Sequence, residues 1–265
     1  MKWLADIYRW QMSTTLAIQL QYRAGLAIWM IEVVLEPVIY LVVWQAAVGG
    51  GEIAGYAARD FAAYYLMMMI VTHLTQMWHM WEFEWRIREG QFNRLLLLPI
   101  HPIHGDIASN LTYKALMMIV VVPAVIFLAL VFQPVFTPPA WSVAAFIPAV
   151  MLAAALAFVL GWVVAMAAFW TVRITAINQM YFLAMLFFSG FIAPLDVLPT
   201  FLQSIAGVLP FQWIYAFPIE LSLGRLSVDE AVLGFAMQGA WLAVSVGLLL
   251  IIWKQAIRRY GAVGG

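Results

Sequence analysis

The 265-residue sequence contains no cysteine and few charged residues. The absence of cysteine excludes a disulfide framework and any thiolate metal site. Charged residues make up only 10% of the chain and hydrophobic residues 66%, against about 25% and about 45–50% in an average soluble domain. The formal net charge is zero, which argues against nucleic acid as a partner. The composition therefore predicts a membrane protein.

Catalytic motifs are missing as well. There is no G-x-x-x-x-G-K-[ST] loop, so the chain has no P-loop with which to hydrolyse ATP, and neither H-E-x-x-H nor G-x-S-x-G occurs. His101 and His104 lie three residues apart around Pro102, but no further ligand completes a metal site at a suitable spacing. We therefore expect no catalytic residue, metal or cofactor in this chain, and a membrane enzyme is disfavoured.

Six apolar segments have lengths near the roughly 20 residues that a bilayer crossing requires, and one of them is shorter. The expected fold is an all-α polytopic membrane protein in which residues 1–265 form a single transmembrane domain. Short connections between the spans leave no room for an additional soluble domain. The spans are predicted at residues 26–48, 61–81, 115–132, 148–170, 177–193 and 231–253.

Two segments are expected to lie in the membrane region without crossing it. Residues 1–23 carry a polar and an apolar face at helical spacing, with Trp3 and Trp10 on the apolar face. This pattern predicts an interfacial helix, which serves either as an anchor or as a contact for a partner. Residues 194–223 stay apolar but are broken by four prolines, so neither half can cross a bilayer. We expect a re-entrant helical hairpin there, entering from the outer face and surrounded by protein.

Lysine and arginine are concentrated on one side of the predicted spans. If both termini are inside, Arg59 and Arg225 are the basic residues left on the outer side, and the rest lie inside. The opposite orientation would invert this ratio. The positive-inside rule therefore places both termini and residues 82–104 in the cytoplasm.

Glu32 and Glu36 lie one turn apart on one face of the first predicted span. A charged side chain costs at least about 2.5–3.5 kcal/mol at the bilayer centre, so we expect neither to face lipid. Two roles remain open. They line a translocation path or contact a cationic substrate, or they pair with a basic residue such as Lys114 or with a partner subunit.

Small residues recur every four positions in two predicted spans. Such stripes allow helix backbones to approach closely in lipid, either within one chain or between subunits. The stripes consist of Ala153, Ala157, Gly161 and Ala165 in the fourth span and of Gly239, Ala243 and Gly247 in the sixth.

The segment between the second and third spans, residues 82–104, combines charges of both signs with a block of four leucines. Its spacing predicts a short helix lying along the inner membrane surface and ended by Pro99 and Pro102. The order Arg88-Glu89-Gly90, Leu95-Leu96 and then Pro99 resembles the cytoplasmic connector of ABC-2 type transport permeases. Pro99-Ile100-His101-Pro102 is most similar to a branch whose permeases occur as pairs of unlike subunits. The SGFIAP sequence that ends at Pro194 also resembles the re-entrant segment of this family.

The resemblance implies a function and a set of partners. The chain would be the membrane-spanning subunit of an ATP-driven exporter in the bacterial cytoplasmic membrane, moving an amphiphilic, lipid-like, drug-like or glycan substrate. Two ATP-binding subunits, which hold ATP and magnesium, and a second permease, identical or unlike, would complete the unit. Residues 82–104 would be the coupling helix that docks on the ATPase. The expected docking residues are Glu82, Arg86, Arg88, Glu89, Gly90 and Arg94.

One alternative function remains open from the sequence. A secondary transporter driven by an ion gradient could use Glu32 and Glu36 as proton carriers. An internal repeat would favour that reading, and no convincing one relates the two halves of the chain.

Overall fold

A computed structural model describes residues 2–21, 23–171 and 173–260. These residues form helices and no strand, apart from an isolated bridge between Ile53 and Tyr56. The longer helices are α1 (Lys2–Gln21), α2 (Arg23–Val48), α3 (Ala58–Thr75), α6 (Ile103–Phe132), α7 (Ala140–Ala165), α8 (Thr175–Phe188) and α12 (Val228–Arg259). The shorter ones are α4 (His79–Arg88), α5 (Gln91–Leu96), η1 (Met166–Phe169), η2 (Leu195–Val197), α9 (Thr200–Val208), α10 (Phe211–Ile214) and α11 (Ala216–Ser222).

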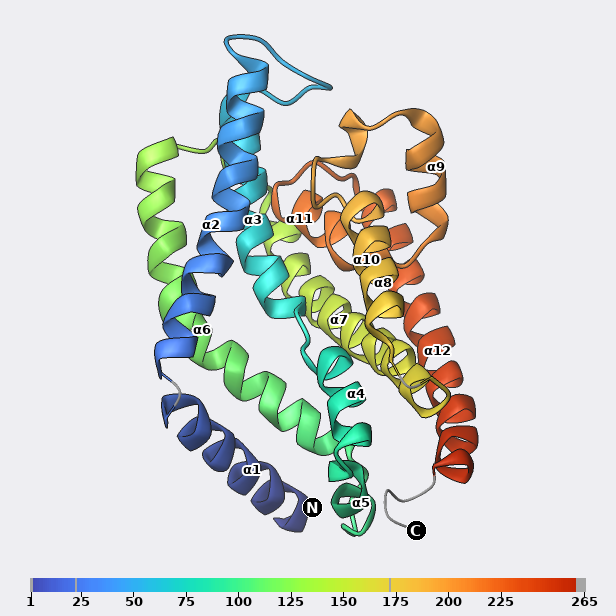
Figure 1. Cartoon of the computed structure of the whole chain (residues 1–265). Coiled ribbons are helices and arrows are strands. Elements are labelled where there is room, and N and C mark those ends of the chain that lie inside the picture. Colours follow the sequence, from blue (N-terminus) through green and yellow to red (C-terminus); the bar gives the residue numbers. More distant parts are fainter. Residues whose placement is uncertain (1, 22, 172, 261–265) are drawn as a thin grey trace.

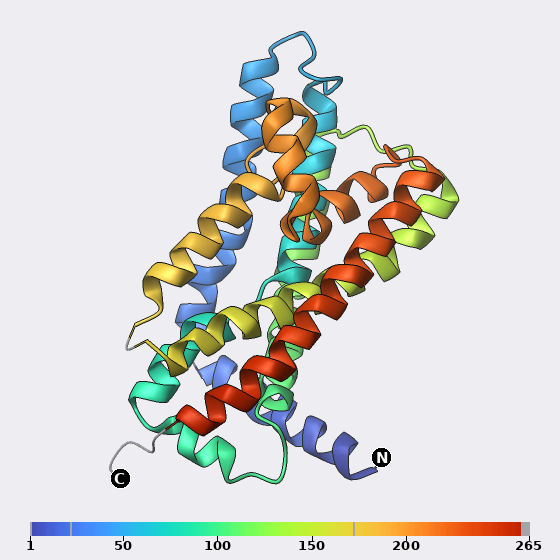
Figure 2. The ribbon, with the colours of Figure 1, turned by 90° about the vertical axis from the view of Figure 1, so that its right-hand side faces the viewer.

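The helices run between two ends of the molecule (Figures 1 and 2). The start of α1, the short helix α5 and the end of α12 gather at one end, which we call the inner end. The loop of residues 49–57 and α9 lie at the opposite, outer end. Helix α1 packs along the inner part of α6. The termini of the helical part of the chain therefore share one end with the connector.

Three helical stretches in the described part of the chain are long and apolar enough to cross a membrane: α6, α7 together with η1, and α12. Shorter apolar stretches lie at Val33–Val48 in α2 and in α8. Two helices begin earlier than predicted, because α6 starts at Ile103 and not at residue 115, and α7 starts at Ala140 and not at residue 148. In α6 the added turns carry Asp106 and Asn110, whose polar groups bond to other segments.

The predicted second and fifth spans are wrong at one end. Helix α3 stops at Thr75, and the chain is non-helical before α4 begins at His79, whereas the prediction ran unbroken to residue 81. The Nδ2 group of Asn110 donates to the main-chain oxygen of Gln76 (3.0 Å), which stabilises this break. Helix α8 stops at Phe188, and Gly190 then adopts a φ of +86°, a left-handed conformation that favours glycine.

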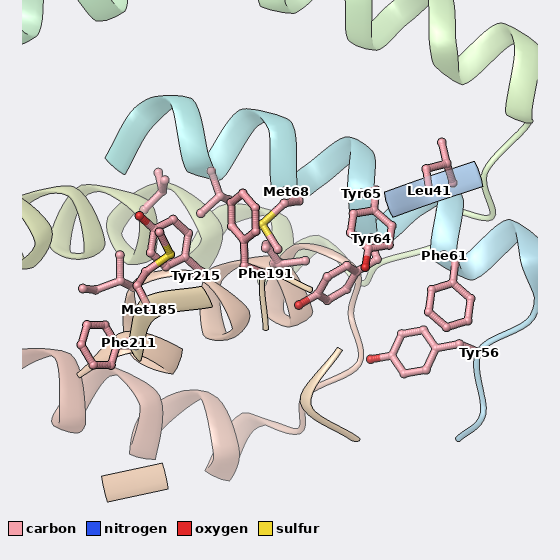
Figure 3. Close-up of a cluster of buried hydrophobic side chains, with 14 of the residues drawn as sticks. Leu41, Tyr56, Phe61, Tyr64, Tyr65, Met68, Met185, Phe191, Phe211 and Tyr215 are labelled. Carbon is pink, nitrogen blue, oxygen red and sulfur yellow. The ribbon is translucent and has the colours of Figure 1, made fainter. Parts of the chain in front are cut away.

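Residues 194–223 form η2, α9, α10 and α11 at the outer end, and none of these helices is long enough to cross a membrane. Helices α10 and α11 contribute to a cluster of buried aromatic and apolar side chains that also draws on α2, α3, α7 and α8 (Figure 3). This cluster is the core of the outer half of the molecule.

Three aromatic side chains satisfy the non-helical backbone that follows α8. The Tyr64 hydroxyl donates to the carbonyl of Gly190 (2.8 Å). The carbonyl of Ile192 accepts from both the Tyr65 hydroxyl (2.5 Å) and the Trp44 indole (2.7 Å). Irregular backbone within a membrane protein requires such internal partners, because lipid offers none.

We expect Tyr64→Phe to be more destabilising than Tyr65→Phe. Tyr64→Phe removes the hydroxyl that donates a hydrogen bond to the Gly190 carbonyl. A buried acceptor left without a donor costs about 1–3 kcal/mol in the free energy of unfolding. After Tyr65→Phe the carbonyl of Ile192 keeps the Trp44 donor, so the loss should stay below about 1 kcal/mol. Unfolding of the two variants in matched detergent micelles measures the difference. Equal losses would contradict this assignment of the two hydroxyls.

The two small-residue stripes face different surroundings. In α7, Ala153, Ala157, Gly161 and Ala165 are buried, and a Cβ on Gly161 would lie 2.5 Å from the sulfur of Met77. The α7 stripe therefore packs within the chain. In α12, Gly239 and Ala243 are exposed, and a Cβ on Gly239 or Gly247 would meet no atom within 4 Å. The α12 stripe points away from the rest of the described chain.

Candidate functional site

The connector between α3 and α6 consists of two short helices joined at a sharp turn. Helix α4 ends at Arg88, and α5 begins at Gln91. Gly90, between them, has a φ of +68°, which a residue with a Cβ adopts only with strain. After α5, Pro99 precedes the turn into α6, and Pro102 is the residue before its first turn. The single short helix predicted for residues 82–98 is thus bent into two arms.

The buried side of the connector is aromatic. Phe83 of α4 and Phe92 of α5 are fully buried, and their ring centroids lie 5.4 Å apart. Phe92 also lies 5.2 Å from the ring of Phe169 and 5.8 Å from that of Tyr260. Trp162 of α7 packs edge-on against Phe83 at 4.8 Å. We call these five residues the inner aromatic cluster; it seats the connector on α7, η1 and the end of α12.

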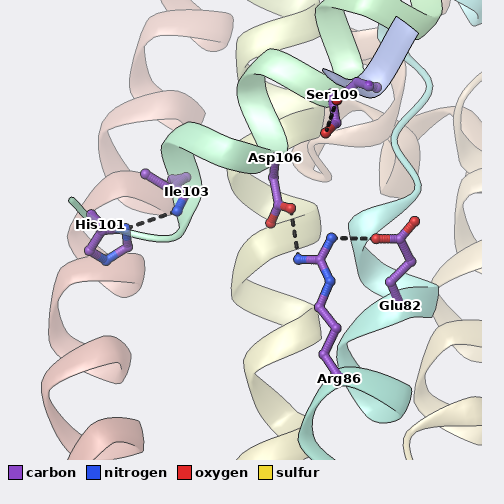
Figure 4. A network of polar contacts seen from close by, with 7 residues as sticks. Glu82, Arg86, His101, Ile103, Asp106 and Ser109 are labelled. Atoms are coloured by element: carbon purple, nitrogen blue, oxygen red, sulfur yellow. Dashed lines mark hydrogen bonds and ion pairs between the residues drawn. The ribbon is translucent and has the colours of Figure 1, made fainter. Parts of the chain in front are cut away.

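Arg86 does not project from the connector. One of its guanidinium nitrogens donates to Asp106 of α6 (2.7 Å) and another bonds to Glu82 of α4 (Figure 4). The side chains of Arg86 and Asp106 are only 16% and 6% exposed. Burial acts to lower the pKa of Arg86, but the carboxylates of Asp106 and Glu82 outweigh it and raise that pKa. Arg86 is thus a permanently charged link between the connector and α6.

The other predicted charges lie on the exposed side. Arg88 and Glu89 are each about half exposed, and Nε of Arg88 lies 3.4 Å from Oε1 of Glu89. Arg94 of α5 is exposed and forms no ion pair with a described residue. Glu82 is half exposed although it contacts Arg86. The connector therefore leaves Arg88, Glu89 and Arg94 exposed, with Arg94 at the gap toward α1, and keeps Arg86 inside.

Two acidic residues of this region were missed at the sequence level. Asp106 could have been noticed as a lone carboxylate at the start of a long apolar helix. Glu84 accepts from the main-chain N–H of Ile174 (3.0 Å) and from the hydroxyl of Thr175 (3.3 Å), so it caps the start of α8. No local signal could reveal that contact, since about 90 residues separate Glu84 from α8.

The two connector histidines have different partners. The ring of His101 lies 4.3 Å from that of Trp253, and its Nδ1 accepts from the N–H of Ile103 (3.2 Å). Burial and then the neighbouring His104 lower the pKa of His101, which favours this neutral form. Nδ1 of His104 lies 2.8 Å from the hydroxyl of Tyr8. Over the described ranges, no group of three or more His, Cys, Asp or Glu side chains could hold a metal ion.

Glu36 of α2 is half-buried and lines a cavity of about 50 Å³ together with Thr72, His73 and Gln76. A carboxylate in this position faces polar groups, as the cost of exposing it to lipid requires. Glu32 is also in α2, but its side chain lies outside the described residues.

Composition, three long apolar helices and a charged connector at one end define a polytopic helical membrane protein. Residues 30–264 match the ABC-2 family transporter protein family, so the chain belongs to that family. A comparison with curated proteins finds no match. The family is a membrane component of transporters and not an ATPase, and in general it implies an ATP-binding partner subunit.

Proposed function

We propose that this chain is the membrane-spanning subunit of an ATP-driven exporter, powered by a separate ATP-binding subunit that docks on the connector. The main support for the proposal is that, in a chain of this family, the connector has one buried aromatic side and one exposed charged side. Its aromatic side is held in the inner aromatic cluster, while Arg88, Glu89 and Arg94 are exposed at the inner end. Such a surface offers a partner both a rigid seat and charged groups.

In the proposed arrangement α2, α3, α6, α7, α8 and α12 cross the cytoplasmic membrane of a bacterium, with both termini in the cytoplasm. Helix α1 lies along the inner surface, and residues 194–223 form a re-entrant element on the outer side. The distribution of lysine and arginine supports this orientation. The aromatic donors to Gly190 and Ile192 support a protein-surrounded, non-helical segment at membrane depth.

In the proposed mechanism, ATP and magnesium bind in the partner, and ATP binding draws two ATP-binding subunits together. The connectors follow, and the membrane helices shift between an inward-open and an outward-open arrangement. This is a two-state equilibrium biased by a ligand that binds elsewhere. The substrate is an amphiphilic, lipid-like, drug-like or glycan molecule. A second permease, identical or unlike, completes the unit, and the outward-facing stripe of α12 offers a surface for close helix approach.

Reconstitution tests the proposal. The chain is purified with the proteins that bind it and is placed in vesicles, with and without the co-purifying ATP-binding subunit. We expect substrate movement only with that subunit, ATP and magnesium. Transport by the chain alone, driven by a proton gradient and lost in Glu36→Gln, would instead establish the ion-driven alternative.

A further inference from the structure

At the inner end, helix α4 of the connector and helix α6 have different main packing partners. Helix α4 packs on α7, η1 and α8, whereas α1 packs along α6. Two cavities, each of about 330 Å³, lie between these groups. Trp29 and Trp81 line the first cavity, and Trp10 and Trp85 line the second. The backbone of α4 is thus separated from the inner part of α6 by space on two sides.

Arg86 and Asp106 form the wall that the two cavities share. Both residues line both cavities, and the bond between them crosses from α4 to α6 (Figure 4). Ser109, one turn further along α6, also lines both cavities, but its hydroxyl pairs with Thr15 of α1 (3.2 Å). The Ser109 contact therefore joins α6 to α1, whereas the Asp106 contact joins α6 to the connector.

We propose that Asp106 is a positioning residue that transmits displacement of the connector to α6 through Arg86. The proposal rests on the proposed function, since it assumes that an ATP-binding subunit moves the connector. The ion pair is short, directional and largely closed to water, so water screens it little and it resists separation. The cavities on either side leave few backbone contacts between α4 and the inner part of α6, so the ion pair is a polar link where other contacts are sparse.

A role of the ion pair in folding can be separated from a role in transmitting displacement. Replacing a buried ion pair by apolar residues of similar size is often neutral for folding, whereas removing one partner is not. Ile103 and Ile107 also pack the start of α6 against buried side chains of α4, α5 and α7, independently of the ion pair. The double variant Arg86→Met/Asp106→Leu is therefore expected to fold, yet its side chains have no directional bond across the gap.

The experiment uses the full complex in vesicles and measures substrate transported per ATP hydrolysed, together with the affinity of the ATP-binding subunit. For Arg86→Met/Asp106→Leu we expect unchanged docking and continued hydrolysis, with the ratio reduced about tenfold, within the range that coupling mutations reach. Arg86→Lys, which cannot engage both carboxylates with a planar fork, should lower the same ratio less. Asp106→Glu should preserve it, and Ser109→Ala, which leaves the ion pair intact, is the matched control.

Either folded variant, Arg86→Met/Asp106→Leu or Arg86→Lys, overturns the proposal if it retains the wild-type ratio. An equal loss in Ser109→Ala would overturn it as well, because that variant leaves the link to the connector intact. Failure of the proposed function looks different: the wild-type chain would then bind no ATP-binding subunit, or would transport without one.

Discussion

Reversing Arg88 and Arg94 to glutamate together is expected to release the ATP-binding subunit and abolish ATP-driven transport. Both side chains are exposed on the connector, and Arg94 has no ion-pair partner among the described residues. A hydrogen bond to a charged group contributes about 1.5–3 kcal/mol, so losing two should weaken docking about hundredfold or more. Repulsion by the new charges adds to this loss. Titration of the purified ATP-binding subunit onto the chain measures the affinity.

Arg173→Glu is the matched control for that double reversal. Arg173 is also exposed, in the link between η1 and α8, but it lies outside the connector. We expect its reversal to change the affinity less than about threefold, since isolated surface charges contribute little. Wild-type affinity in Arg88→Glu/Arg94→Glu would show that the docking surface lies elsewhere. A comparable loss in Arg173→Glu would point to long-range attraction and not to a specific contact.

Phe92→Ala is expected to cost about 3–5 kcal/mol in the free energy of unfolding. Phe92 is fully buried, and its ring contacts those of Phe83, Phe169 and Tyr260. Because this cluster lies at the inner end, truncation both opens a cavity and releases the connector from the end of α12. Transport should therefore fall more steeply than the amount of folded protein. Denaturant unfolding in micelles and transport in vesicles, each per folded chain, measure the two effects.

Leu97→Ala provides the comparison within the same segment. Leu97 follows α5 directly and is 85% exposed, so its truncation should change stability by less than about 0.5 kcal/mol. Similar losses in Phe92→Ala and Leu97→Ala would contradict the inward seating of α5. A destabilised Phe92→Ala that transports normally per folded chain would show that the seating matters for folding alone.

The contact of Arg86 with Asp106 was not predictable from the sequence. Arg86 lies among Glu82, Arg88 and Glu89, and spacing along one helix gave no means of separating it from the exposed arginine two residues later. The difference arises from Asp106, which α6 carries to within 2.7 Å of Arg86. A contact of this kind depends on how two helices are placed, and local patterns carry no information about that.

The small-residue stripes show the same limit. Both have the four-residue period that permits close helix packing, yet the α7 stripe is buried in the chain and the α12 stripe is open. The four-residue spacing of small residues indicates that a helix face can pack closely. The position of the surrounding helices determines whether it does so within the chain. The break after Thr75 is a further case, since an amide from α6, Asn110, supports it.

Composition alone was sufficient for the class of protein, a helical membrane protein, and the charge distribution predicts the side on which the connector should lie. These properties follow from transfer of side chains between water and lipid, which depends on residue type and local order. Only the tertiary structure decided which connector charges are exposed and which are paired inside, where the helices begin and end, and which stripe is left open. Those outcomes depend on contacts between residues far apart in the chain, such as Arg86 with Asp106 and Tyr64 with Gly190.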